Sequence, residues 1–156
     1  MKLHDFIAAI RDELQLDSLE ADDEGVYGIV FDDGLDVEII ALTSNDILLR
    51  SRLADLPTDE AEQDSLCDGL LKHNLAALRD QWASLSLDWD SGCFWLASRH
   101  RLDQVDLRGF FERLEGFVNS VAWWEKYLAF RQGSSAGDYS SRQGAMDSLF
   151  VNFIRP

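Results

Sequence analysis

Two stretches of this chain alternate in polarity on either side of a short turn, and each stretch predicts an antiparallel hairpin. In residues 25–40, GVYGIVFDDGLDVEII, two such runs flank Asp-Asp-Gly, where Gly accepts a positive φ and Asp tolerates one. In residues 84–98, the runs SLSLDW and CFWLAS flank Asp-Ser-Gly in the same way. Two hairpins without alternation of strand and helix indicate an antiparallel sheet and the class α+β.

Three segments have apolar residues three or four positions apart, the spacing of amphipathic helices. The first covers residues 2–16. The second follows Pro57, with Thr58 as its expected N-cap, and ends near Arg79. The third is expected to start at a cap on Asp103 and to be the longest. Its 3-4 spacing also fits a coiled coil, but additional aromatic residues widen the apolar stripe and favour a helix lying along a sheet.

The expected order of elements, with a third strand at residues 47–53, is α-β-β-β-α-β-β-α. We therefore expect a twisted antiparallel sheet of about five strands, covered by helices on one face. Residues 1–131 are expected to form a single domain, because one core suits a chain of 156 residues. Residues 132–156, which are rich in Gly and Ser and have an apolar end, SLFVNFIRP, are expected to form a flexible tail.

The charge of the chain is strongly negative and unevenly distributed. The formal net charge is −15, and residues 1–90 contain 22 acidic and 6 basic side chains. Nucleic-acid binding is not expected, because it needs clustered Lys and Arg. No apolar run approaches the length of a membrane span, and charged residues near the start argue against a secretory leader, so a cytoplasmic location is expected. An acidic surface maintains solubility and suits a basic or aggregation-prone partner.

Catalytic and metal-binding motifs are not found in the sequence. Cys67 and Cys93 lack metal-site spacing and are expected to be buried thiols. Ser98, His100 and Asp103 have the residue types of a catalytic triad, but their closeness in sequence makes convergence on an oxyanion site difficult. We therefore expect no catalytic residue, no metal and no cofactor.

The chain resembles the class I type III secretion chaperones, the Tir-chaperone (CesT-like) family. The resemblance is carried by GVYGIVFDDGLDVEI, LRSRLADLP, LCDGLLKHNL and LSLDWDSGCFWLASRHRLDQVD, in that order. It implies a bacterial homodimer that binds the N-terminal segment of a secreted effector without catalysis and keeps it export-competent. Contact with the export ATPase is also implied, without assignable residues.

The resemblance implies two surfaces. Effector-binding grooves lined by the first helix and first strands would use Leu3, Phe6, Ile7, Ile10, Val26, Val30, Ile40 and Leu49. The dimer interface would use Leu66, Leu70, Leu71, Leu85 and Leu87. If Ile10 lines a groove, Ile10→Asp should abolish partner binding and leave the dimer folded.

Three other functions remain open on the sequence alone. The chain could be an acidic adaptor or regulatory module of the same fold with no role in secretion. It could be an enzyme with an unrecognised site, which would require a deep pocket holding several perturbed polar groups. A scaffold built on a coiled coil of the last helix would instead be elongated.

Overall fold

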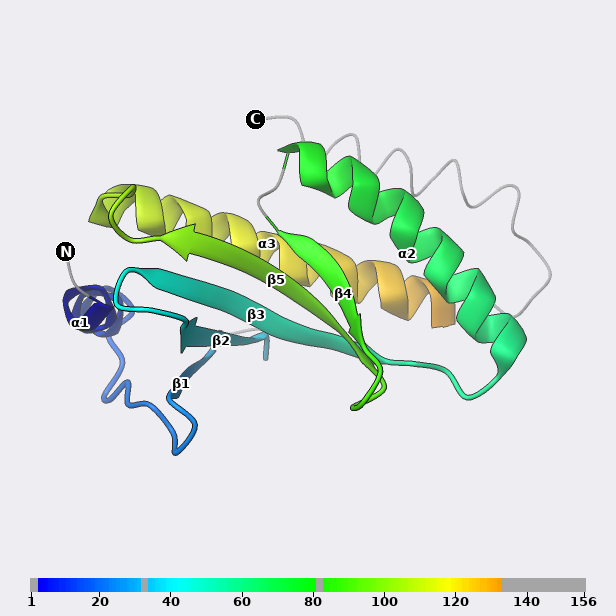
Figure 1. The fold of residues 1–156 in the computed structure, drawn as a ribbon, viewed down its shortest axis with the longest axis horizontal. Helices are drawn as coiled ribbons and strands as arrows, with labels where there is room; N and C mark the ends of the chain where they lie inside the picture. Colours follow the sequence, from blue (N-terminus) through cyan, green and yellow to red (C-terminus); the bar gives the residue numbers. More distant parts are fainter. Residues whose placement is uncertain (1–2, 32–33, 81–82, 133–156) are drawn as a thin grey trace.

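The computed structural model describes residues 3–31, 34–80 and 83–132 (Figure 1). Of the tail expected at 132–156, only Gln132 lies within these ranges, as the last residue of a helix. The elements follow the expected order. They are α1 (Leu3–Glu13), β1 (Val26–Val30), β2 (Asp36–Ala41), β3 (Asp46–Asp55), α2 (Glu60–Asp80), β4 (Ser84–Asp88), β5 (Cys93–Arg101) and α3 (Leu107–Gln132).

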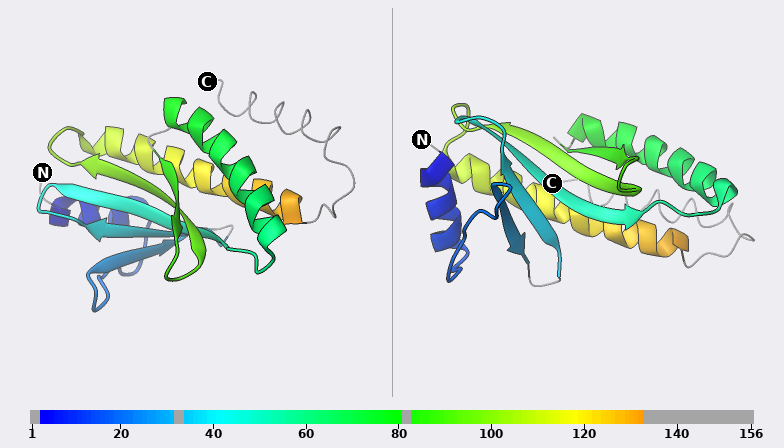
Figure 2. Two further views of the ribbon diagram at one scale, coloured as in Figure 1. Left: turned by 45° about the vertical axis from the view of Figure 1, so that its right-hand side comes forward. Right: turned by 60° about the horizontal axis from the view of Figure 1, so that its bottom comes forward.

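The five strands form one antiparallel sheet with the spatial order β1-β2-β3-β5-β4. α3 runs along β3 and β5, and α1 lies at one end of the same face of the sheet (Figures 1 and 2). α2 lies beside β4 and reaches the C-terminal part of α3, where Arg131 donates a hydrogen bond to the Ser65 carbonyl at 2.7 Å. The expectation of a five-stranded antiparallel sheet covered on one face is confirmed.

The hydrophobic core lies between this inner face of the sheet and the helices. Alternate strand residues point into it, as the register Ile29 to Val37 and Tyr27 to Ile39 shows. The largest side chains that are less than 2% exposed are Trp124, Phe6, Phe110, Ile10, Ile39, Ile47, Leu49, Leu70, Leu96 and Leu102. Burying each such side chain contributes about 1.5–3 kcal/mol.

α3 lies along the sheet, as its wide apolar stripe predicted. Phe110, Leu114, Phe117 and Val121 are all buried in the core. The ring of Phe110 meets that of Phe6 from α1 edge to face, with 5.3 Å between centroids. The apolar face of α3 is thus occupied by the sheet and α1.

The hairpin turns use glycine as expected. Gly34 and Gly92 have φ values of 78° and 63°, in the left-handed region that side chains disfavour. Asp32 and Asp33, the other residues of the first turn, lie outside the described residues. Gly92 closes the turn between β4 and β5, and its carbonyl accepts a hydrogen bond from the Leu56 amide at 2.7 Å.

The expected N-caps of the second and third helices were wrong. Asp59, instead of Thr58, accepts a hydrogen bond from the Glu62 amide at 2.9 Å. Asp106 accepts from the Gly109 amide at 2.8 Å, and Asp103 pairs with Arg101. A turn in which the Gln104 amide bonds to the Arg101 carbonyl delays the start of α3, so a later aspartate becomes the cap.

His100 is buried in β5 with only 2% of its surface exposed. Its Nε2 lies 2.8 Å from the Ser98 hydroxyl oxygen. Burial and, to a lesser extent, the positive charge of Arg113 lower the pKa of His100 from 6.5 to about 4. The imidazole is therefore neutral at pH 7.

We expect Ile10→Asp to unfold the chain, because Ile10 is 0% exposed and a carboxylate there has no partner. The cost should be about 4 kcal/mol or more, against about 1 kcal/mol for Ile10→Val. Urea denaturation of both variants measures the loss in the free energy of unfolding. An Ile10→Asp chain as stable as Ile10→Val would contradict the burial of this side chain and restore its expected place in a groove.

His100 should make stability fall as the pH drops. Its folded-state pKa lies below the ordinary value, so its contribution is complete above about pH 6.5 and is lost as the pH falls toward 4. The loss should reach about 2 kcal/mol at pH 5. Denaturation from pH 7.5 to 5 should show this slope in the wild type and a shallower one in His100→Gln. Equal pH slopes in the two proteins would contradict this role of His100.

Candidate functional site

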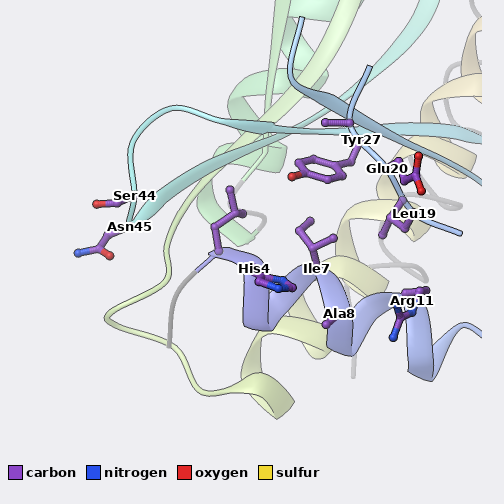
Figure 3. A pocket seen from close by; sticks show the side chains of 11 residues that line it. His4, Ile7, Ala8, Arg11, Leu19, Glu20, Tyr27, Ser44 and Asn45 are labelled. Atoms are coloured by element: carbon purple, nitrogen blue, oxygen red, sulfur yellow. The ribbon is translucent and has the colours of Figure 1, made fainter. Parts of the chain in front are cut away.

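A groove with a volume of about 760 Å³ lies between α1, the loop that follows it and the start of β1 (Figure 3). We name it the α1 groove. Its lining residues are Leu3, His4, Ile7, Ala8, Arg11, Leu19, Glu20, Ala21, Tyr27, Ser44 and Asn45.

The floor of the α1 groove is formed by one side of α1, at the margin of the core. Leu3, Ile7 and Arg11 recur every four residues and so share one side of the helix. Phe6 and Ile10 lie on the neighbouring side and face the core. Leu3 and Ile7 thus give the groove an apolar floor, and Arg11 stands at its polar rim.

A hydrogen-bonded loop forms the second wall. The Asp22 carboxylate accepts hydrogen bonds from the amides of Glu24 and Val26, each at 2.9 Å. The Asp22 amide donates to the Val26 carbonyl, also at 2.9 Å. These bonds fix the end of the loop to β1 and hold Leu19 across from α1, as Figure 3 shows.

The third wall belongs to the edge of the sheet. Tyr27 of β1 is half-buried and its ring faces Ile7 across the groove (Figure 3). β1 is the terminal strand of the sheet and has only β2 as a neighbour among the strands described. The groove therefore runs beside a terminal strand whose first residue, Val26, is bonded to Asp22 and whose remaining residues have no second strand neighbour among those described.

The sequence-predicted groove residues occupy three different places. Leu3 and Ile7 line the α1 groove, and Ile7, only 7% exposed, is at the same time part of the core. Phe6, Ile10 and Leu49 are at most 1% exposed and lie in the core, where their side chains cannot reach a partner. The remaining three are on the outer face of the sheet, which α1 and α3 do not cover. They are Val26 and its cross-strand neighbour Ile40, together with Val30, which is 69% exposed.

Sequence reasoning missed several lining residues of the α1 groove. Ala8 and Arg11 share the helix side of Leu3 and Ile7, so helical spacing contains a signal for them. Ser44 and Asn45 reach the groove from the turn between β2 and β3, and no local pattern predicts that approach.

The residues predicted for a dimer interface are divided between the core and the surface. Leu66 and Leu70 are 7% and 1% exposed and belong to the core of the single chain. Leu85 and Leu87 of β4 are half-buried against the same core. Leu71 is 67% exposed, and Leu75, one turn further along α2, is 70% exposed, so these two form an apolar strip on the helix surface.

The described residues show neither of the two site types that the sequence raised, a metal cluster and a catalytic triad. Within residues 3–31, 34–80 and 83–132, no three His, Cys, Asp or Glu side chains gather as they would around a metal. Asp103 is paired with Arg101 and does not orient His100, so the three triad-type residues do not act together. None of the helices in these ranges has the length and apolarity to span a bilayer.

The fold is similar to those of several solved complexes. The structure of the ExsC-ExsE complex aligns with a TM-score of 0.63 at 20% identity, over 81% of this chain and 96% of that chain. The HopA1-SchA chaperone-effector complex aligns with a TM-score of 0.64 at 16% identity, over 79% and 92%. The ExoU-SpcU complex from the type III secretion system of Pseudomonas aeruginosa gives 0.59 at 14% identity, over 80% and 95%.

Identities this low establish a shared fold. No curated protein sequence matches the chain at a significant level. A model of the Tir chaperone protein (CesT) family, however, matches residues 5–125, which include all five strands. The chain therefore belongs to the Tir chaperone protein (CesT) family.

Proposed function

We propose that this protein is a non-catalytic bacterial chaperone that binds the N-terminal segment of one or more type III secreted effectors in the cytoplasm. It keeps that segment soluble and competent for export. The observation that carries this proposal is the apolar α1 groove beside the open edge of β1. Membership of the CesT family and the chaperone-effector complexes of the same fold support it.

Binding would use the backbone and the side chains of the effector separately. An extended segment adds to the β1 edge through main-chain hydrogen bonds, which are indifferent to sequence. Every second side chain of that segment then points to the face on which Tyr27 and Ile7 lie. The groove thus selects apolar side chains in alternation, and the edge contributes affinity for extended chains in general.

A homodimer would cover the apolar strip on α2. Leu71 and Leu75 expose most of their surface in the single chain, and water contact with such a strip is unfavourable. β4, the other terminal strand of the sheet, lies beside α2, so one surface could bring both elements to a second copy. Contact with an export ATPase is part of the same proposal.

The effector groove is tested by Ala8→Asp. A carboxylate on the floor of the α1 groove should weaken effector binding at least about tenfold, because apolar client side chains would have to desolvate it. The matched control is Ala9→Asp, on the same helix but outside the groove lining. Clients identified by native affinity purification supply the ligand, and calorimetry measures its dissociation constant. Equal binding by both variants would place the site elsewhere.

The dimer surface is tested by the double variant Leu71→Glu and Leu75→Glu. Light scattering should report the mass of two copies for the wild type and of one copy for the variant, because two carboxylates in an apolar interface prevent association. Lys72→Glu introduces the same side chain at an exposed neighbour on α2 and should remain dimeric. A dimeric double variant would exclude this strip as the interface.

A further inference from the structure

The two ends of the α1 groove carry different side chains. Ser44 and Asn45 lie at one end, and Arg11 and Glu20 lie at the other, as Figure 3 shows. The apolar part lies between them and includes Ile7. The carboxylate and the guanidinium of the lining are therefore both at the end formed by α1 and the loop that follows it.

Glu20 is the acidic side chain of the groove lining, and it is not paired with Arg11. The Arg11 guanidinium is turned to Asp12, whose Oδ1 accepts hydrogen bonds from Nε at 3.0 Å and from Nη2 at 2.7 Å. The Glu20 side chain is exposed, and it takes part in no hydrogen bond or ion pair within the described part of the chain. Because Arg11 and Asp12 offset each other, Glu20 leaves this end of the groove with a negative charge.

The loop that carries Glu20 contains acidic side chains and no Lys or Arg. It covers residues 14–25, LQLDSLEADDEG, and its acidic residues are all exposed: Asp17, Glu20, Asp22, Asp23 and Glu24. Elsewhere acidic side chains have basic partners, as Glu38 has in Arg50. Within residues 3–31, 34–80 and 83–132, no ion pair includes a side chain of this loop. The charge complementary to this wall is therefore that of a basic ligand.

The groove adds a spacing to this charge. Ile7 and Arg11 are one turn of α1 apart, which is about 6 Å along the helix axis. In an extended peptide, side chains two positions apart point to the same face and are about 6.5–7 Å apart. A peptide whose apolar side chain packs on Ile7 therefore brings the side chain two positions away to the end of the groove where Glu20 lies.

We propose that the α1 groove is specific for an extended segment with an apolar residue and, two positions from it, Lys or Arg, whose positive charge lies beside the Glu20 carboxylate. That this segment belongs to an effector and binds in extended form rests on the proposed function, to which the inference adds a side-chain rule. The groove repels an acidic segment at Glu20. A wholly apolar segment leaves the charge of this wall unused.

The test uses synthetic peptides. The probe is acetyl-Thr-Lys-Thr-Ile-Thr-Lys-Thr-amide, which has lysine two positions from isoleucine on both sides and so presumes no chain direction. One control has Glu in place of both lysines. The second control is the isomer acetyl-Thr-Thr-Lys-Ile-Lys-Thr-Thr-amide, which has the same composition and charge. Its lysines are one position from isoleucine and point to the opposite face of an extended chain.

The probe should bind more tightly than both controls. Binding to the full chain is followed by NMR of the Leu3 and Ile7 methyl groups, at up to about 5 mM peptide, the range of weak contacts. In about 20 mM salt we expect the probe to bind about tenfold more tightly than the Glu peptide and about threefold more tightly than the isomer. Both preferences should shrink in about 0.5 M salt, because salt screens exposed charges.

A matched pair of variants assigns the preference to one carboxylate. Glu20→Lys and Asp23→Lys change the net charge equally, at exposed positions of the same loop, but only Glu20 lines the groove. Glu20→Lys should bind the probe and its isomer equally, because the carboxylate that the probe lysine approaches is lost. Asp23→Lys should keep the preference of the wild type for the probe over the isomer.

Three results would overturn the proposal. The first is equal binding of the probe and its isomer to the wild type, which general attraction to an acidic chain predicts. The others are the absence of any shift at Leu3 or Ile7 in the measured range, and an unchanged preference in Glu20→Lys.

The proposed function fails in a different experiment. An effector that binds Ala8→Asp as tightly as the wild type excludes the α1 groove as its site, whatever the peptides do. An effector that is lost in Ala8→Asp, together with equal binding of the probe and the isomer, removes the side-chain rule and leaves the proposed function in place.

Discussion

The packing of α3 and α1 onto one face of the sheet is the contact on which the rest of the molecule depends. Phe110 and Trp124 of α3 are buried against strand side chains such as Leu96, and Phe6 of α1 closes one end of this layer. Because the helices cover only that face, the strand edges and the outer face remain at the surface. Each candidate site lies where the packed layer ends.

The two terminal strands of the sheet, β1 and β4, lie in different surroundings. β1 ends the sheet on one side, and α1 together with its following loop forms an apolar groove beside it. On the other side, β4 pairs with β5 from Cys93 to Ala97 and lies beside α2. The two terminal strands of the sheet thus have different neighbours, an apolar groove beside β1 and the helix with the exposed leucines beside β4.

On the outer face of the sheet, charged side chains of β2, β3 and β5 pair with one another. Arg50 forms an ion pair with Glu38 and stacks over the ring of Trp95, 4.6 Å from its centroid. Arg99 pairs with Asp46 at 3.0 Å. These contacts place positive charges of a strongly acidic chain next to acidic partners, so the outer face offers neither a free basic patch nor a broad apolar one across β3 and β5.

The sequence by itself determined the elements and their class. Alternation in the two hairpins, glycine in their turns and helical spacing are local signals, and α+β with an antiparallel sheet follows from them. Its resemblance to the Tir-chaperone family was confirmed by the family match. Tertiary structure decided which apolar side chains are available. Ile7 and Ile10 have the same chemistry in the same helix, yet Ile7, 7% exposed, reaches the wall of a groove, whereas Ile10 is 0% exposed and does not. Spacing shows that a helix has an apolar side, but only packing against residues distant in sequence determines how much of that side is covered.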